Sequence, residues 1–75
     1  MKNIPDNIPL GIYRHFKGNE YELIAIARDS EDPDRFFAVY RALYGDSDVW
    51  VRPLDMFCEK VVRDGKVIPR FSYVG

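Results

Sequence analysis

The fold is decided by two neighbouring runs of the chain, VYRALYG at residues 39–45 and VWVRPL at residues 49–54. Both runs are rich in β-branched and aromatic residues, and such residues are enriched in strands. The residues between them, Asp46-Ser47-Asp48, have the composition of a turn. The two runs therefore predict a hairpin in the middle of a small sheet. This hairpin contains Trp50, the only tryptophan in the sequence.

The length and composition of the chain predict one small globular domain. It has 75 residues, of which 47% are hydrophobic and 31% charged, with a net charge of −1. This charge disfavours a general nucleic-acid binder, which gains affinity by neutralising phosphates. The apolar runs are far shorter than the roughly 20 residues of a membrane span. The first ten residues lack the apolar segment of a signal peptide, so we expect a cytoplasmic location.

The N-terminal residues differ from the rest of the chain. Residues 1–10 are predicted to form an extended arm, and residues 11–75 a single small β-rich domain. Two prolines in the arm push the residues before them towards extended conformations and donate no backbone hydrogen bond. The apolar side chains that can anchor the arm are Ile4, Ile8 and Leu10.

A hairpin is predicted before the central one, with strands at 11–16 and 20–28 joined by Lys17-Gly18-Asn19. Strand alternation predicts two faces for the second of these strands. One face carries Tyr21, Leu23, Ala25 and Ala27, and the other carries Glu22, Ile24, Ile26 and Arg28. The acidic stretch DSEDPD at 29–34 is predicted to be a surface loop leading into the next strand.

The C-terminal part of the chain is predicted to hold one helical turn and a last hairpin. Pro53 suits the first position of a helical turn, after which Leu54, Phe57 and Cys58 are expected to face inwards. Asp64-Gly65 is a strong turn signal between strands at 59–63 and 66–71. The weak amphipathicity of these strands, together with Pro69, indicates an edge position.

These elements predict a mostly β fold, a small curled SH3-like barrel of five or six short strands with one helical turn before the last hairpin. Closure of the sheet would hide edges that a flat sheet of this size leaves open. The alternative is an α+β fold in which residues 30–43 are helical, since Ser30 or Asp32 can cap a helix.

Several of these segments together resemble a known family. The blocks are YRHFKG at 13–18 followed by Tyr21, YRALYG at 40–45, WVRPL at 50–54 with Met56-Phe57 and Glu59, Asp64-Gly65, and PRF at 69–71. They resemble the small bacterial family catalogued as domain of unknown function 1653, over residues 11–71. The resemblance implies a bacterial stand-alone domain. It brings no established activity, cofactor or catalytic residue.

The sequence offers little for catalysis or metal binding. His15 is the only histidine and a candidate general base, with Asp29 or Glu31 as groups that would orient it. The alternative is a half-buried strand histidine. One histidine and the single Cys58 do not make the usual zinc set, and the acidic loop lacks the pattern of a calcium loop. We therefore expect no metal and no cofactor, and a non-catalytic role is preferred over catalysis by His15.

Aromatic and basic residues form the candidate binding site. If the two hairpins are neighbours, several of these side chains converge, and guanidinium groups beside rings bind planar or anionic ligands. The candidate residues are Tyr13, His15, Arg28, Tyr40, Arg41, Trp50 and Arg52. The competing interpretation is that the rings are core and the arginines point to solvent or pair with carboxylates.

The preferred function is a non-catalytic binding module that uses this aromatic and arginine face for a peptide, a protein or a small anionic ligand. The alternatives are a small accessory enzyme domain that uses His15 and a binder of single-stranded nucleic acid. The net charge disfavours the second alternative, and no membrane partner is expected. A thin core allows a weak homodimer through the arm or the last hairpin.

Overall fold

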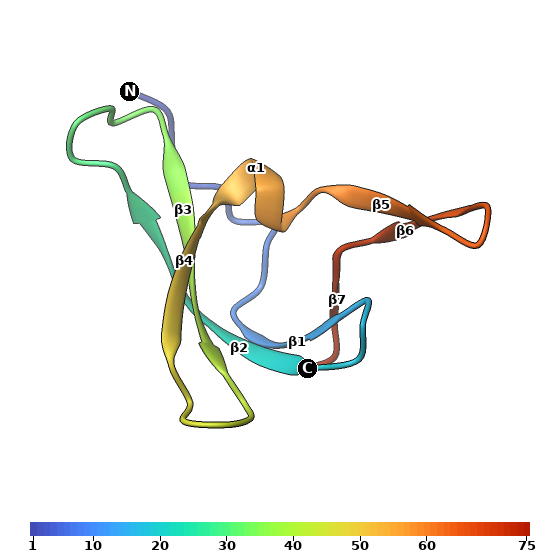
Figure 1. Ribbon diagram of the computed structural model, residues 1–75. Coiled ribbons are helices and arrows are strands. Elements are labelled where there is room, and N and C mark those ends of the chain that lie inside the picture. Colours follow the sequence, from blue (N-terminus) through green and yellow to red (C-terminus); the bar gives the residue numbers. More distant parts are fainter.

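The protein is built on an open antiparallel sheet of five strands. The computed structural model describes residues 1–75 (Figure 1). The strands of the main sheet lie in the spatial order β4-β3-β2-β1-β7. Their bounds are β1 Gly11–His15, β2 Glu20–Arg28, β3 Phe36–Ala42, β4 Val49–Pro53 and β7 Phe71–Tyr73.

A short helix and a separate hairpin connect β4 to β7. The helix, α1 (Leu54–Phe57), follows β4 directly, and β5 (Lys60–Arg63) pairs with β6 (Lys66–Pro69) as a two-stranded sheet. Asp64 and Gly65 both have positive φ, 53° and 75°, as a two-residue hairpin turn of this kind requires. The last hairpin predicted from Asp64-Gly65 is therefore confirmed. It projects away from the main sheet (Figure 1).

The sheet does not close into a barrel. β4 and β7 are the two outer strands, and no pairing joins them. The strand predicted at residues 66–71 is interrupted at Arg70, and only Phe71–Tyr73 returns to the main sheet, where it pairs with β1. The mostly β prediction is right, but the SH3-like barrel is not confirmed. The α+β alternative is wrong because Phe36–Ala42 forms β3.

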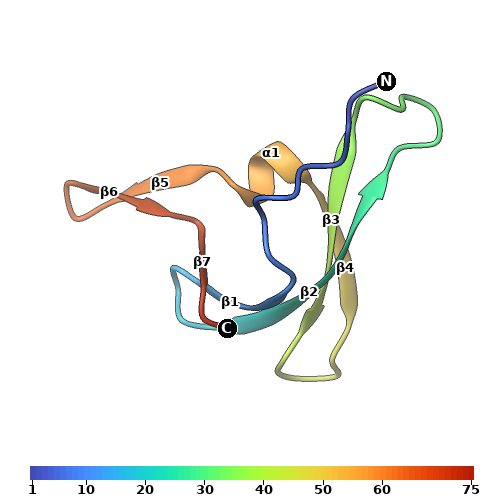
Figure 2. The same cartoon turned by 180° about the vertical axis from the view of Figure 1, so that it is seen from behind.

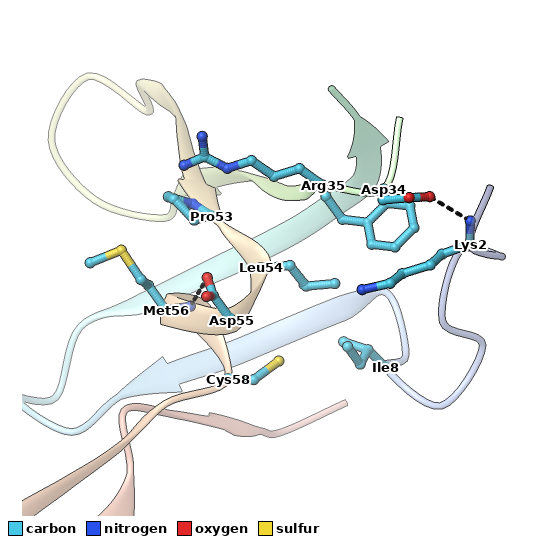
Figure 3. A pocket seen from close by; sticks show the side chains of 10 residues that line it. Lys2, Ile8, Asp34, Arg35, Pro53, Leu54, Asp55, Met56 and Cys58 are labelled. Atoms are coloured by element: carbon cyan, nitrogen blue, oxygen red, sulfur yellow. Dashed lines mark hydrogen bonds between the residues drawn. The ribbon is translucent and has the colours of Figure 1, made fainter. Parts of the chain in front are cut away.

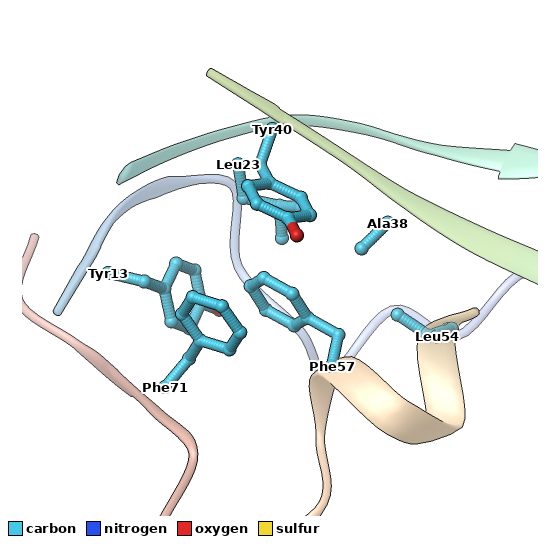
Figure 4. Close-up of a cluster of buried hydrophobic side chains, with 7 residues drawn as sticks. All are labelled: Tyr13, Leu23, Ala38, Tyr40, Leu54, Phe57 and Phe71. Atoms are coloured by element: carbon cyan, nitrogen blue, oxygen red, sulfur yellow. The ribbon is translucent and has the colours of Figure 1, made fainter. Parts of the chain in front are cut away.

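A cluster of buried side chains packs between one face of the sheet and α1 (Figure 4). Its members are Tyr13, Leu23, Ala38, Tyr40, Leu54, Phe57 and Phe71. The rings of Phe57 and Phe71 are stacked, with centroids 4.3 Å apart and planes at 11°. The helical turn supplies Leu54 and Phe57, as predicted, whereas Cys58 is exposed and the prediction that it faces inwards is wrong.

A β-bulge changes which side chains of β2 face the core. Leu23 lies opposite Tyr40 and Ile26 lies opposite Ala38, so that one extra residue is accommodated between Leu23 and Ala25. The alternation reverses at this point, because the side-chain period in a strand is two. Ile26 therefore packs against the core with Leu23, and the predicted two faces of this strand are wrong beyond Leu23.

The N-terminal segment crosses the body of the domain beside α1 (Figure 2). The backbone N–H of Lys2 donates to Asp34 Oδ1 at 2.8 Å. The Tyr13 hydroxyl donates to the Pro9 carbonyl oxygen at 2.7 Å. Ile8 packs against the core cluster, whereas the other two proposed anchors are exposed. Arg28 Nη1 donates to the Lys2 carbonyl oxygen at 2.8 Å. One apolar side chain and three hydrogen bonds thus hold this segment to the domain.

Candidate binding site

Seven side chains line a hollow of about 230 Å³ on the core side of the main sheet. We call it the aromatic hollow. Its residues are His15, Tyr21, Tyr40, Tyr44, Trp50, Arg52 and Phe71. They come from all five strands of the sheet and from the turn after β3.

Strand register brings these residues together. Tyr40 lies directly opposite Trp50 on the β3–β4 pair, and His15 lies directly opposite Phe71 on the β1–β7 pair. Directly opposed residues of antiparallel strands project from the same face. Tyr21 lies opposite Ala42 on β2–β3, on the face that also carries Tyr40. Residues far apart in the sequence therefore share one wall of the hollow.

The ring of Tyr21 is the centre of this wall. Its centroid lies 5.4 Å from that of Tyr40, 5.5 Å from that of Tyr44 and 5.6 Å from that of Phe71, each in an edge-to-face arrangement. Edge-to-face contacts at these separations are the favoured geometry for aromatic pairs. The rings therefore support one another and fix the shape of the wall.

Tyr21 and Tyr44 also share a hydrogen bond between their hydroxyl groups, with the oxygens 2.7 Å apart. Burial is the largest cause that raises the pKa of Tyr21 to about 12, and the hydrogen bond to Tyr44 is the second. Tyr21 is therefore protonated and uncharged at neutral pH. Tyr44, by contrast, is exposed at the rim.

Arg52 supplies the charge of the aromatic hollow. Its Nε donates to the Tyr40 hydroxyl at 3.3 Å, and its guanidinium carbon lies 5.9 Å from the centroid of Phe71. No hydrogen bond or ion pair within the chain engages its two Nη atoms. None of the seven lining residues carries a carboxylate. The positive charge in the hollow is thus not neutralised by the protein.

His15 is held as a neutral ring. Its Nδ1 accepts the backbone N–H of Lys17 at 3.1 Å, so the neutral imidazole carries its hydrogen on Nε2. Burial lowers the pKa of His15, and the charges of Arg52, Arg70 and Lys17 lower it further. The neutral ring thus adds a hydrogen-bond donor, Nε2–H, and no charge to the lining.

Asp29 and Glu31, the carboxylates predicted to orient His15, lie at the opposite end of β2 from it. His15 is beside the start of β2, where its backbone N–H donates to the carbonyl of Asn19, whereas Asp29 and Glu31 follow the end of that strand. Asp29 Oδ1 instead accepts the backbone N–H of Glu31 at 2.8 Å within the acidic loop. The imidazole therefore has no carboxylate partner of the kind a catalytic dyad uses.

Four of the seven candidate residues from the sequence converge on the hollow, namely His15, Tyr40, Trp50 and Arg52. The other three do not. Tyr13 is a buried member of the core cluster. Arg28 is at the far end of β2, where it donates to the backbone carbonyls of Lys2 and Pro33.

Arg41 is separated from the hollow by the sheet itself. It is adjacent to Tyr40 on β3, and successive strand residues point to opposite faces. Its Nη1 lies 3.7 Å from Glu22 Oε1 in an exposed ion pair. Arg41 therefore belongs to the solvent-facing side of the sheet.

Sequence reasoning missed three lining residues, Tyr21, Tyr44 and Phe71. Tyr21 had a detectable signal, since it was predicted to share a face with Leu23. Tyr44 follows the end of β3, where alternation no longer fixes the side-chain direction. Phe71 enters the hollow through the pairing of β7 with β1, which no local pattern indicates.

A larger hollow of about 500 Å³ lies between the N-terminal segment and α1 (Figure 3). Its charges are mixed, because Lys2 and Arg35 line it together with Asp34 and Asp55. Both carboxylates already accept backbone N–H groups, Asp34 from Lys2 and Asp55 from Met56, each at 2.8 Å. This hollow therefore favours no particular ligand charge.

The structure contains neither a cluster of metal-binding side chains nor a membrane-spanning helix. No three His, Cys, Asp or Glu side chains come close enough together to hold a metal ion. The only helix is a single turn, which is too short to traverse a bilayer.

The comparisons with known proteins agree with one another. Residues 11–73 match the family described as protein of unknown function DUF1653. The fold is similar to the crystal structure of a DUF1653 protein from Bordetella bronchiseptica, with a TM-score of 0.82 and 34% sequence identity over 92% of this chain and 90% of that one. No curated protein matches the sequence. The chain belongs to the DUF1653 family.

Proposed function

We propose that this domain is a non-catalytic binding module whose aromatic hollow takes a flat anionic group, a carboxylate carried on an aromatic ring. The observation that supports it is the Arg52 guanidinium, which lies among aromatic rings with no carboxylate in the lining and with both Nη atoms unpaired. An unneutralised cation in such a place attracts an anion more strongly than it would in open water.

The chemistry of the lining matches both parts of such a ligand. The two Nη groups of a guanidinium bind a carboxylate through parallel hydrogen bonds. The rings of Trp50 and Tyr44 are about half exposed at the rim, 52% and 45%, and offer faces on which a flat group stacks. The volume is below the roughly 300–1,000 Å³ of sites for drug-sized molecules, which matches a single ring.

Trp50 provides the signal for a direct test. Its indole is the only one in the chain, so a ligand in the hollow changes the tryptophan fluorescence. The probes are benzoate, its neutral amide benzamide and the ringless anion acetate. Benzoate is expected to bind, while benzamide and acetate each bind at least about tenfold more weakly because each lacks one half of the recognition. Equal responses to benzoate and benzamide would contradict the proposal.

A pair of arginine variants separates the site from general charge. Arg52→Gln is expected to reduce benzoate affinity at least about tenfold. Arg41→Gln removes the same charge from the opposite face and is expected to leave benzoate affinity unchanged. If the two variants behave alike, the binding is not in the aromatic hollow.

Two kinds of ligand carry a carboxylate close to an aromatic ring: a free aromatic acid and the C-terminus of a polypeptide. A peptide ending in phenylalanine has a ring and a free carboxylate together, and its C-terminally amidated form lacks the charge. Stronger binding of the free-acid peptide than of benzoate supports a polypeptide ligand. Stronger binding of benzoate supports a small molecule.

The two alternatives from the sequence predict different behaviour. Binding of single-stranded nucleic acid would weaken steeply with added salt. The hollow has the stacking rings such binding uses, but the domain has a net charge of −1. Catalysis through His15 would be abolished in His15→Ala, whereas a binding role leaves that variant able to bind benzoate with reduced affinity.

A further inference from the structure

We propose that two copies of this chain associate through the free edge of β4, which pairs antiparallel with the β4 of a second copy. β4 is an outermost strand of the main sheet and is paired on one side only, with β3 (Figure 1). Three consecutive apolar side chains on it are exposed, Val49 at 54%, Trp50 at 52% and Val51 at 63%.

The backbone of β4 leaves alternate residues free to bond outwards. The N–H of Ala42 donates to the Asp48 carbonyl at 2.9 Å, so these two residues form a hydrogen-bonded pair. Hydrogen-bonded and non-hydrogen-bonded pairs alternate along an antiparallel ladder. In the register of β3 with β4, Trp50 and Arg52 therefore bond to β3, and the N–H and C=O groups of Val49 and Val51 point to the open edge.

One register makes this edge complementary to itself. If the two-fold axis passes beside Trp50, Val49 of one copy bonds to Val51 of the other, and the two indoles lie opposite each other. In this register Asp48 of each copy lies opposite Arg52 of the other, on the face that carries Trp50. Opposite charges in directly opposed positions stabilise a strand pair, as do aromatic and β-branched pairs. The charge match selects a second copy as the partner.

The composition of β4 also lacks the usual protection of an edge. Natural edge strands carry lysine, inward-pointing charges or proline that prevent pairing with another strand. On β4 such residues are confined to its end, Arg52 on the core side of the sheet and Pro53, while Val49, Trp50 and Val51 carry no protecting group. The other outer strand, β7, is three residues long and offers a shorter template.

The proposal does not depend on a ligand in the aromatic hollow. Arg52 keeps one contact within its own chain, from Nε to the Tyr40 hydroxyl, and its Nη atoms are available to the partner's Asp48. Since a bound anion would use the same Nη atoms, self-association is measured in the absence of aromatic acids.

The test is sedimentation equilibrium of the full chain over a concentration series that reaches about 1 mM, which detects a dimer with a Kd in the millimolar range. The wild type is expected to show reversible dimerisation. Asp48→Arg places like charges opposite each other twice and is expected to weaken the dimer at least about tenfold. The double variant Asp48→Arg/Arg52→Asp exchanges the charges and is expected to restore it.

A second pair of variants leaves Arg52 unchanged, so that its result does not depend on whether a substitution of Arg52 disturbs the fold. Val51→Lys adds a charge to the β4 edge and is expected to weaken the dimer, whereas Val62→Lys makes the same change on the exposed β5–β6 hairpin and is expected to leave it unchanged. Circular dichroism checks that each variant is folded. A monomeric wild type overturns the proposal. So does a dimer that is insensitive to Asp48→Arg and Val51→Lys, or one that Val62→Lys disrupts.

Discussion

The Nε of Arg52 donates a hydrogen bond of 3.3 Å to the hydroxyl oxygen of Tyr40. The two residues are on neighbouring strands, and Tyr40 lies opposite Trp50, two positions before Arg52. This bond uses Nε and leaves both Nη atoms without a hydrogen-bond partner in the chain. The proposed binding of anions requires this arrangement, in which Nε holds the guanidinium to Tyr40 and the two Nη atoms are free for a ligand.

Tyr40→Phe should reduce both stability and anion binding. The variant keeps the buried ring and removes only the acceptor of the Arg52 hydrogen bond, so the free energy of unfolding should fall by about 0.5–1.5 kcal/mol. Benzoate affinity should fall as well, because Arg52 is no longer held at the wall. Urea denaturation and fluorescence titration measure the two effects. Tyr73→Phe is the control, since Tyr73 is 53% exposed and no hydrogen bond is made by its hydroxyl.

Phe57→Ala should unfold much of the population. Phe57 is 2% exposed and stacks on Phe71 at 4.3 Å, and truncation of a buried phenylalanine costs about 3–5 kcal/mol. The total stability of a small domain is about 5–15 kcal/mol, and a thin core places this one near the lower limit. Met56→Ala, at the preceding exposed position, should change the free energy of unfolding by less than about 0.5 kcal/mol. Equal losses would mean that α1 does not anchor the core.

Stability should fall as the pH is lowered through the range in which the histidine of the unfolded chain titrates. Burial and the neighbouring cations lower the pKa of His15 in the folded protein, so the unfolded chain, with a histidine pKa of about 6.5, takes up the proton first. The contribution of neutral His15 to the free energy of unfolding is fully present above about pH 6.5. It declines as the pH falls and is lost once the pH has passed below the pKa of His15 in the folded protein. His15→Gln should remove this component from urea denaturation curves measured at a series of pH values. A pH dependence identical to the wild type would contradict it.

Arg52→Gln should raise the pKa of His15 in the folded protein. The charge of Arg52 is the second cause of the lowered value, after burial, and the amide of glutamine has no charge. Nuclear magnetic resonance titration of the single imidazole gives the pKa directly. Arg41→Gln, on the other face of the sheet, should leave that pKa unchanged, and a shift of equal size in both variants would show that Arg52 does not act locally.

Tyr44→Phe should lower the pKa of Tyr21 from about 12, although not to the ordinary value of about 10, because burial is the larger cause. The variant removes the hydroxyl partner 2.7 Å away and keeps the ring contact. Alkaline titration with labelled tyrosine resolves the individual hydroxyls. An unchanged pKa of Tyr21 would mean that the two hydroxyls are not bonded in solution.

Local patterns were sufficient to predict much of this fold. The turn at Asp64-Gly65 and the central hairpin depend on residues close together in the sequence. The same is true of the convergence of Tyr40, Trp50 and Arg52, because two strands joined by a short turn are paired and their alternation fixes which side chains share a face.

Errors came from effects that are not local. The bulge after Leu23 reverses the alternation of β2, and the sequence around it shows no glycine or proline to mark it. Phe71 of β7 pairs with His15 of β1, near the other end of the chain. Periodicity describes only neighbouring residues, so it could not predict the open sheet or the contribution of Phe71 to the hollow. Arg41 is different, since alternation alone already placed it on the side of β3 away from Tyr40.

The most direct measurement of the binding proposal is a nuclear magnetic resonance titration with benzoate that follows the Arg52 side-chain N–H groups and the Trp50 indole N–H. Both signals should shift together and saturate at the same benzoate concentration, while those of Arg41 stay in place. Saturating shifts at Arg41, or none at Arg52, would contradict the proposal that this hollow holds the anion.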